Sequence, residues 1–365
     1  MRIAQVPPLY EAVPPKLYGG TERVVSYLTE ELVEQGHEVT LFGTRDSVTK
    51  ANLFPICQQA TRLNPNCKDP LAWHIYQMQV VLEHANEFDI IHFHTDYLHF
   101  PLSAQSQYKH ITTLHGRLDM DDLKPIYKKF FEIPVVSISN SQRKPLPYAN
   151  WVDTVYHGLP KELYQLGDGS GGYLAFLGRI SPEKRPDRAI EIAKRAGIKL
   201  KMAAKVDKAD QEYYEKTIKP LLDHPLIEFI GEIGEDQKGA FLGNAIALLF
   251  PIDWPEPFGM VMIEAMANGT PVIAFNHGSV PEVIEHGRTG FIVNNLDQAV
   301  KAVENLHLVS RTECRRIFEN LFTSSVMADN YAVLYEQLCK KRKRTFRLSD
   351  LHRKFSKEKY IPMAN

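Results

Sequence analysis

Two glutamates and two cations form the most specific chemical pattern in the chain. Seven residues separate Glu256 from Glu264 within PIDWPEPFGMVMIEAMANGTPVIAF, and Arg179 and Lys184 bracket the turn in GRISPEK. A carboxylate accepts hydrogen bonds from hydroxyl groups. The planar fork of arginine and the point charge of lysine both bind phosphate, so two such cations across one loop can converge on a diphosphate. The cations therefore indicate a diphosphate site, and the glutamates supply hydrogen-bond acceptors.

The residues around the glutamates predict how they are held. Pro257 fixes φ and is tolerated where a helix begins, so we expect a helix to start there and to end at Asn268-Gly269. Glu256 would then lie at the mouth of this helix, where free N–H groups and a partial positive charge attract phosphate oxygens. The alternative is a half-buried helix with one capping and one solvated glutamate. Three residues near the helix start are further candidates for ligand contact: Phe258, Gly259 and Met260.

The N-terminal part of the chain predicts a strand, a glycine loop, a helix and a second strand. Residues 1–8 and 38–42 read as buried strands, and the helix between them has apolar residues at helical spacing. Gly19 and Gly20 precede this helix, with Thr21 as its expected N-cap. A glycine pair alone is often just a turn. Its place at the carboxyl end of the first strand, where open α/β sheets bind ligands, favours a binding role.

Polar residues follow three later strands of this half. The strand over 89–95 is DIIHFHT, and the residues His92, His94 and Asp96 give an HxHxD pattern, which is a ligand pattern of metallo-hydrolases. Such sites usually have a further histidine directly after the aspartate, where this chain has Tyr97. We therefore favour a polar lining of a cleft over a metal site. The next two strands, over 111–116 and 135–139, add two candidate site residues: His115 and Asn140.

The pattern restarts after Gly167–Gly172, whose sequence GDGSGG reads as a flexible linker. Residues 173–205 predict strand, basic loop, helix and strand, and more strands and helices follow, ending with a helical segment over 311–338. Residues 48–69 show little periodicity and read as loop. The chain therefore predicts an α/β fold with two Rossmann-like domains that face a central cleft.

The Glu, seven residues, Glu pattern with its PFG step resembles the donor-sugar motif of the retaining glycosyltransferases of family 4, which have the two-domain GT-B fold. The resemblance implies that Glu264 holds the ribose hydroxyls of a nucleotide and that Glu256 lies beside the donor sugar. Gly19 and Gly20 would cover the donor phosphates and sugar, and His115 would contact the sugar. The family has a glycine where this chain has Arg185.

The resemblance also sets expected domain limits. An acceptor-side domain would span 1–165 and be joined by a C-terminal helix at about 326–345. The nucleotide-sugar domain would span 166–325, and a basic tail would span 346–365.

The implied activity is transfer of a hexose from a nucleotide-diphosphate sugar, by family frequency a UDP-sugar, to a small-molecule, glycan or lipid-linked acceptor. Asp96 and Asn140 would lie on the acceptor side. Arg179, Lys184 and two helix N-termini would stabilise the leaving diphosphate without a metal or another cofactor. Whether the retaining route is a front-face ion pair or a covalent adduct on Glu256 stays open. The alternatives are a UDP-sugar 2-epimerase of the same fold and a non-catalytic nucleotide-sugar-binding protein.

Composition limits the remaining possibilities. The chain has 365 residues, a formal net charge of −1 and four scattered cysteines without a CxxC pair, so we expect a cytoplasmic protein without disulfides. No GxGxxG turn supports an oxidoreductase, and the body has no overall attraction for nucleic acid. Residues 340–359 hold ten Lys or Arg and two acids. This basic segment is either a solvated extension or a contact with the inner face of an anionic membrane.

Overall fold

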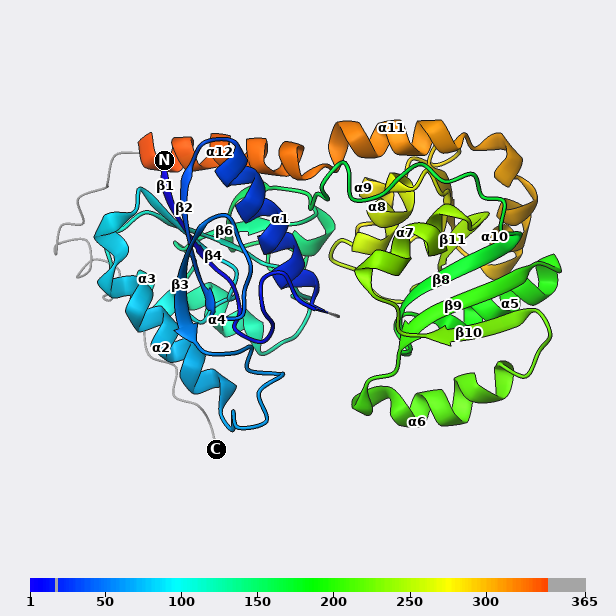
Figure 1. The fold of residues 1–365 in the computed structure, drawn as a ribbon, viewed down its shortest axis with the longest axis horizontal. Helices are drawn as coiled ribbons and strands as arrows, with labels where there is room; N and C mark the ends of the chain where they lie inside the picture. The colour runs from blue at the N-terminus through cyan, green and yellow to red at the C-terminus, as the bar shows by residue number, and fades with distance from the viewer. Residues whose placement is uncertain (17–18, 341–365) are drawn as a thin grey trace.

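The computed structural model describes residues 1–16 and 19–340, which form two α/β domains side by side (Figure 1). Within these residues, the first domain has a seven-stranded parallel sheet in the order β3-β2-β1-β4-β5-β6-β7. Helices cover both of its faces, so its central strands β1, β4 and β5 are buried along nearly their whole length although they include polar residues. The strands are Arg2–Val6 (β1), Glu38–Thr44 (β2), Asn52–Cys57 (β3), Ile90–Phe93 (β4), His110–Thr113 (β5), Pro134–Ser137 (β6) and Asn150–Thr154 (β7).

The second domain, all of whose residues are described, has a six-stranded parallel sheet in the order β10-β9-β8-β11-β12-β13. In both sheets the strand order reverses beside the first strand, between β1 and β4 and between β8 and β11. Open α/β sheets bind ligands at the carboxyl ends of strands at such a point. The strands are Tyr173–Arg179 (β8), Lys199–Lys205 (β9), Ile227–Gly231 (β10), Ala247–Phe250 (β11), Val272–Phe275 (β12) and Gly290–Val293 (β13). The predicted fold class, two Rossmann-like domains, is confirmed.

The last helix returns to the first domain, as the resemblance implied. In Figure 1 it runs along the first domain beside the N-terminus, while the helix before it covers the second domain. Tyr331, Leu334 and Tyr335 of this helix are buried with Ile3 and Leu28 of the first domain. The expected helix residues 341–345 and the basic tail 346–365 lie outside the described residues. None of the helices in the described part is long and apolar enough to cross a membrane.

The helices vary from single turns to five turns. They are Gly20–Glu34 (α1), Pro70–Glu83 (α2), Phe100–Ser103 (α3), Leu123–Lys129 (α4), Pro186–Ala196 (α5), Gln211–Tyr213 (α6), Glu235–Gly243 (α7), Met260–Ala267 (α8), Val280–Val283 (α9), Leu296–Glu304 (α10), Arg311–Leu321 (α11) and Ser324–Lys340 (α12).

Two predicted segments have a different structure. The expected loop over 48–69 contains β3, an edge strand that pairs with β2. Its sequence NLFPIC includes a proline. An edge strand tolerates proline, but a proline within the segment argued against a strand in the sequence pattern. The expected continuous helix from residue 311 is broken between α11 and α12 at Phe322 and Thr323.

This break lies where the two domain connections meet. Leu159 donates its N–H to the carbonyl of Phe322 at 2.9 Å and accepts from Ser324 at 2.8 Å. A Cβ on Gly158 would lie 2.1 Å from the carbonyl oxygen of Thr323, so only glycine fits there. The two connections are therefore bonded to each other as a short parallel pair.

The glycine-rich segment Gly167–Gly172 is not a free linker, contrary to the prediction. Backbone N–H groups of Gly167, Gly169 and Gly171 donate to carbonyls of the second domain at 2.9–3.1 Å. A Cβ on Gly167 would lie 2.2 Å from the carbonyl oxygen of Gly243. The glycines thus allow two backbones to approach closely, and the segment packs as part of the second domain.

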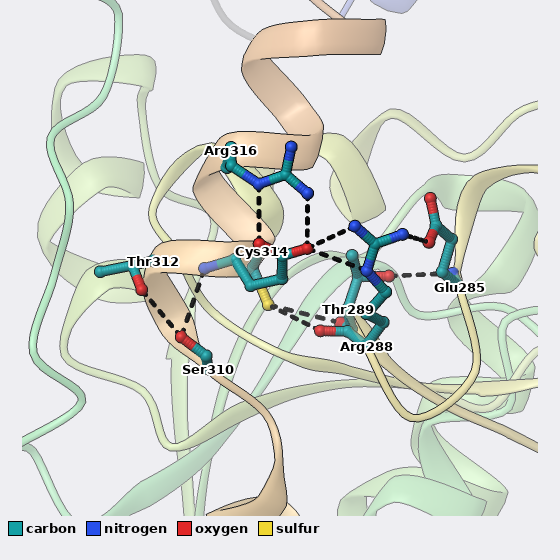
Figure 2. A network of polar contacts seen from close by, with 8 residues as sticks. Glu285, Arg288, Thr289, Ser310, Thr312, Cys314 and Arg316 are labelled. Atoms are coloured by element: carbon teal, nitrogen blue, oxygen red, sulfur yellow. Dashed lines mark hydrogen bonds and ion pairs between the residues drawn. The ribbon is translucent and has the colours of Figure 1, made fainter.

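A surface network fixes α11 to the loop between α9 and β13 (Figure 2). Glu313 accepts hydrogen bonds from Arg288 at 2.8 Å and from Arg316 at 2.8 Å. The Cys314 thiol donates to the carbonyl of Thr289 at 3.7 Å. Burial raises the pKa of this thiol to about 12, so Cys314 packs as an unreactive side chain. α11 in turn packs against α8, which carries Glu264.

Candidate functional site

A cavity of about 560 Å³ lies between the two domains. It is lined by residues at the carboxyl ends of β1, β4, β5, β8, β9 and β11 and by the N-termini of α1 and α8. Its volume is in the range of small-molecule sites. The predicted site residues that line it are Gly19, Gly20, Asp96, His115, Arg179, Lys184, Glu256, Phe258, Gly259, Met260 and Glu264.

Glu256 is held by a cation and an indole. Lys184 donates to one of its carboxylate oxygens, and Trp254 donates its indole N–H to the same oxygen at 3.0 Å. The Lys184 ammonium also lies over the rings of Trp254, at 5.1 Å, and Phe250, at 5.6 Å. One oxygen of Glu256 is therefore engaged, and the lysine is fixed by a carboxylate and two aromatic faces.

The backbone around Glu256 differs from the prediction. Helix α8 begins at Met260, because Gly259 takes the left-handed conformation with φ 79°. Glu256 therefore lies in a loop ahead of the helix and not at its mouth. The N–H of Ser279, at the start of α9, donates to the carbonyl of Glu256 at 3.0 Å. In the described residues, α9 thus supports this loop, and α1 and α8 are the helices whose N-termini line the cavity.

Glu264 belongs to an ion-pair network that joins the domains. Lys238 of α7 lies 2.8 Å from Glu264 and 3.1 Å from Glu235. Arg23 of α1, in the first domain, lies 3.1 Å from the same oxygen of Glu235. Burial alone would lower the pKa of Lys238, but Glu264 and Glu235 outweigh it and raise that pKa. Lys238 is thus a permanent cation beside Glu264.

Arg179, at the end of β8, is surrounded by carboxylates. Its guanidinium lies 2.9 Å from Glu183, 3.5 Å from Asp207 and 3.6 Å from Asp210. The loop that follows ends at Arg185, whose φ of 51° is the left-handed conformation that glycine adopts readily. The backbone at Arg185 therefore has the conformation typical of glycine although the residue is an arginine.

His115 ends a chain of hydrogen bonds from the interior. Its Nε2 lies 2.9 Å from Nδ1 of His94, and Nε2 of His94 lies 2.7 Å from Oε1 of Gln5. The ring of His157 stacks on that of His115 at 5.1 Å. Burial lowers the pKa of His115 to about 3, so the ring is neutral at physiological pH.

The two histidine rings of the HxHxD pattern lie side by side, with centroids 4.0 Å apart, but their nitrogens bond to different partners. His92 points to Tyr335 and Thr113, both at 2.7 Å, while His94 points to Gln5 and His115. In the described ranges, no group of three or more His, Cys, Asp or Glu side chains is arranged to hold a metal ion.

The two predicted acceptor-side residues lie in different places. Asp96 lines the cavity with a left-handed φ of 50°, and desolvation raises its pKa to about 6. Asn140 is not among the described residues that line the cavity. Its backbone N–H and side-chain amide donate to Glu282 of the second domain at 2.7 and 3.0 Å. Asn140 was predicted as a site residue only because it follows a strand. In the structure its side chain contacts the second domain instead.

The contacts that hold Glu256 and Glu264 involve four residues that were not predicted: Arg23, Glu235, Lys238 and Trp254. Trp254 stands in the quoted motif two residues before Glu256, but the motif does not show its bond to the carboxylate. Glu235 and Lys238 are three residues apart on α7, whereas their contact with Arg23 requires α1 and α7 to come together across the cleft, which no local sequence pattern shows.

Two family models match the chain. The model for group 1 glycosyl transferases matches residues 167–320, and that for glycosyltransferase family 4 matches residues 18–155. A D-inositol 3-phosphate glycosyltransferase from Streptomyces scabiei is 33% identical over 35% of this chain and 31% of its own length. An uncharacterized 41.2 kDa protein from the cps region of Klebsiella pneumoniae is 29% identical over 45% of this chain and 46% of its own length. The chain thus spans less than half of these relatives.

Solved structures share the fold over nearly the whole chain. A glycosyltransferase involved in avilamycin A biosynthesis superposes with a TM-score of 0.72 and 22% identity, over 94% of this chain and 99% of its own. An Anabaena protein in complex with UDP-glucose has a TM-score of 0.69 and 15% identity, over 92% and 100%. With both halves matched by family models and the two-domain architecture established, the chain belongs to the family 4-like, group 1 glycosyltransferases of GT-B fold.

Proposed function

We propose that the protein is a retaining glycosyltransferase that moves a hexose from a UDP-sugar to a hydroxyl of a second substrate. The observation that carries the proposal is the meeting of Arg179, Lys184, Glu256 and Glu264 in one cavity between the domains. The Anabaena structure with UDP-glucose and the same fold supports the choice of donor.

The second-domain wall of the cavity fits a nucleotide sugar. Glu264 has one oxygen on Lys238, which leaves the other to accept from ribose hydroxyls. Arg179 and Lys184 lie at the end of β8 and in the following loop, where they can meet the diphosphate. Because both cations are already ion-paired, the diphosphate must displace carboxylates such as Glu183 from Arg179.

The chemical step would leave two negative charges on the departing nucleotide. Once the bound diphosphate has displaced these carboxylates, Arg179, Lys184 and the N-terminus of α8 are positioned to stabilise this charge as it develops. We therefore propose that no metal is required. Addition of a chelator to the assay tests this, since the rate should not change.

Glu256 would orient the sugar. Its carboxylate is shared with Lys184 and Trp254, which suits a hydrogen-bond acceptor better than a covalent nucleophile. On the first-domain wall, Asp96 would accept a hydrogen bond from the attacking hydroxyl. The anomeric configuration of the product, read by NMR coupling constants, tests retention.

The experiment is a thermal-shift screen of nucleotide sugars, followed by an acceptor screen with the best donor. Arg179→Ala and Lys184→Ala should weaken binding of UDP and of UDP-sugar alike, and Glu264→Ala should weaken binding of the nucleoside. Lys194→Ala, an exposed cation of α5 outside the cavity lining, is the matched control. If all three variants bind UDP-sugar as the wild type does, the site assignment is wrong. Conversion of the UDP-sugar into its C2 epimer, with no acceptor-dependent release of UDP, would favour the epimerase instead.

The acceptor is proposed to be a small molecule, a glycan or a lipid-linked sugar. The basic tail 346–365 could bring the enzyme to an anionic membrane that carries a lipid acceptor. Liposome sedimentation of the chain with and without the residues after Cys339 tests this proposal. Equal bound fractions of the two forms would exclude it.

A further inference from the structure

A buried chain of hydrogen bonds runs from helix α12 to the wall of the cavity. The amide nitrogen of Gln5 lies 3.4 Å from the hydroxyl of Tyr335, and the amide oxygen lies 2.7 Å from Nε2 of His94. Nδ1 of His94 then lies 2.9 Å from Nε2 of His115. Gln5 is 0% exposed and His94 2% exposed, so water does not compete for these groups.

The side-chain amide of Gln5 determines which atom donates in each of these hydrogen bonds. An amide oxygen only accepts hydrogen bonds, so Nε2 of His94 must carry the proton. A neutral imidazole has one N–H, so Nδ1 of His94 is a lone pair and the bond between the rings must come from His115 Nε2–H. Burial lowers the pKa of both rings, in agreement with neutral side chains.

A second observation supports the same direction. Within the described part of the chain, Nδ1 of His115 is buried and has no hydrogen-bond partner. If Gln5 had the opposite orientation, His94 would donate to His115, and this buried Nδ1 would carry an unpaired N–H. Unpaired buried N–H groups are rarer than under-satisfied acceptors, which favours a lone pair at Nδ1.

We propose that Gln5 and His94 are positioning residues that hold His115 as the Nε2–H tautomer. Nδ1, which is buried in the unliganded structure, is then a hydrogen-bond acceptor only, so a ligand that reaches it from the cavity must bring the proton. Resting on the proposed function, this selects a donor sugar that presents a hydroxyl toward His115. A carboxylate, which has no proton to give, or a deoxy position there is disfavoured.

The tautomer can be measured without any substrate. Long-range ¹H–¹⁵N correlation spectra of the full chain labelled with [¹⁵N]histidine distinguish a ring nitrogen with a proton from one with a lone pair. The signals of His115 are assigned by their loss in His115→Asn. We expect a protonated Nε2 and an unprotonated Nδ1 in the wild type. In Gln5→Leu, which removes the fixed acceptor, the two tautomers should mix.

The matched control is Thr113→Val. Thr113 is equally buried and bonds to His92 at 2.7 Å and to Tyr331 at 2.7 Å. Through His92 it reaches Tyr335, so it joins the chain only at the α12 end, on the far side of Gln5 from His115. Its removal disturbs the same polar interior and should leave the His115 tautomer unchanged. A protonated Nδ1 in the wild type, or an equal change of tautomer in Thr113→Val and Gln5→Leu, would overturn the proposal.

Binding by calorimetry tests the consequence for the sugar. Gln5→Leu should weaken binding of UDP-glucose roughly five- to tenfold, the worth of one hydrogen bond, and leave UDP unchanged. With monodeoxy analogues of UDP-glucose, the effect of Gln5→Leu should disappear for the analogue that lacks the bonded hydroxyl. An equal loss for UDP, UDP-glucose and every analogue would mean that Gln5 only supports the fold. If UDP-glucose does not bind the wild type, the proposed donor fails, while the NMR result still decides the tautomer.

Discussion

Lys238 offers the most direct test of how the second-domain wall is built. Its ammonium is the cation between two carboxylates, 2.8 Å from Glu264 and 3.1 Å from Glu235, and the side chains of Lys238 and Glu264 are 17% and 6% exposed. Lys238→Met keeps the length and apolar volume of the side chain but leaves Glu264 without its cation. Glu235 keeps Arg23 at 3.1 Å, so one carboxylate, not two, loses its partner.

The expected loss in the free energy of unfolding follows from the number of carboxylates that lose their cation. Removing one partner of a buried ion pair costs about 3–5 kcal/mol. Because Glu235 keeps Arg23 and only Glu264 is left unpaired, we expect a loss near the lower end, about 3 kcal/mol. For a domain of this size that corresponds to a fall in Tm of roughly 6–12 °C. The neighbouring carboxylates raise the pKa of Lys238, so the pair contributes fully at neutral pH and is lost only at strongly alkaline pH.

Urea unfolding at pH 7.5, with UDP binding by calorimetry, measures the effect. Lys238→Met with Glu264→Gln should recover most of the stability but not the affinity for UDP, because the double variant leaves no unpaired charge. Lys238→Arg is the charge-keeping control. A loss below about 1 kcal/mol for Lys238→Met would refute this account of the network.

Three further predictions follow from single contacts. Trp254→Phe keeps an aromatic ring under Lys184 but removes the N–H bond to Glu256. We expect kcat to fall about tenfold while the affinity for UDP in calorimetry stays unchanged. A weaker UDP complex would contradict this. Arg185→Gly should be about 1 kcal/mol more stable to urea than Arg185→Ala, because both lose the ion pairs to Asp187 and Asp253 and only glycine relieves the positive φ. Asp96→Asn should stabilise the protein above pH 6 and have little effect below pH 4, because the raised pKa of Asp96, about 6, makes its ionisation unfavourable to folding; a urea midpoint shift independent of pH would exclude this.

Sequence patterns predicted the fold from the alternation of strands and helices, and they predicted most of the named cavity-lining residues because these lie at the ends of strands. Arg179 ends β8, His115 follows β5 and Glu256 follows β11, and parallel strands bring their carboxyl ends to one edge. The same rule was wrong for Asn140, since a strand end also supplies interdomain contacts.

Other features depend on contacts that lie far apart in sequence. The start of α8 was misplaced because Pro257 is compatible with a helix start, while the left-handed φ of Gly259 decides it. The glycines of 167–172 were read as flexible because composition does not show a neighbouring backbone such as that of Gly243. The contact of Arg23 with Glu235 requires both domains to be in place.

The paired connections at Leu159 and Phe322 make the second domain a continuous insert within the first. The described ends of the first domain also meet, since Arg2 bonds to Asp89 at 2.8 Å and the Cys339 thiol reaches the carbonyl of Asp89 at 3.4 Å. The nucleotide-sugar half can therefore be exchanged between relatives as one segment, with junctions only at 158–159 and 323–324. A chimaera joined at the glycine run 167–172 would instead divide the packed interior of the second domain.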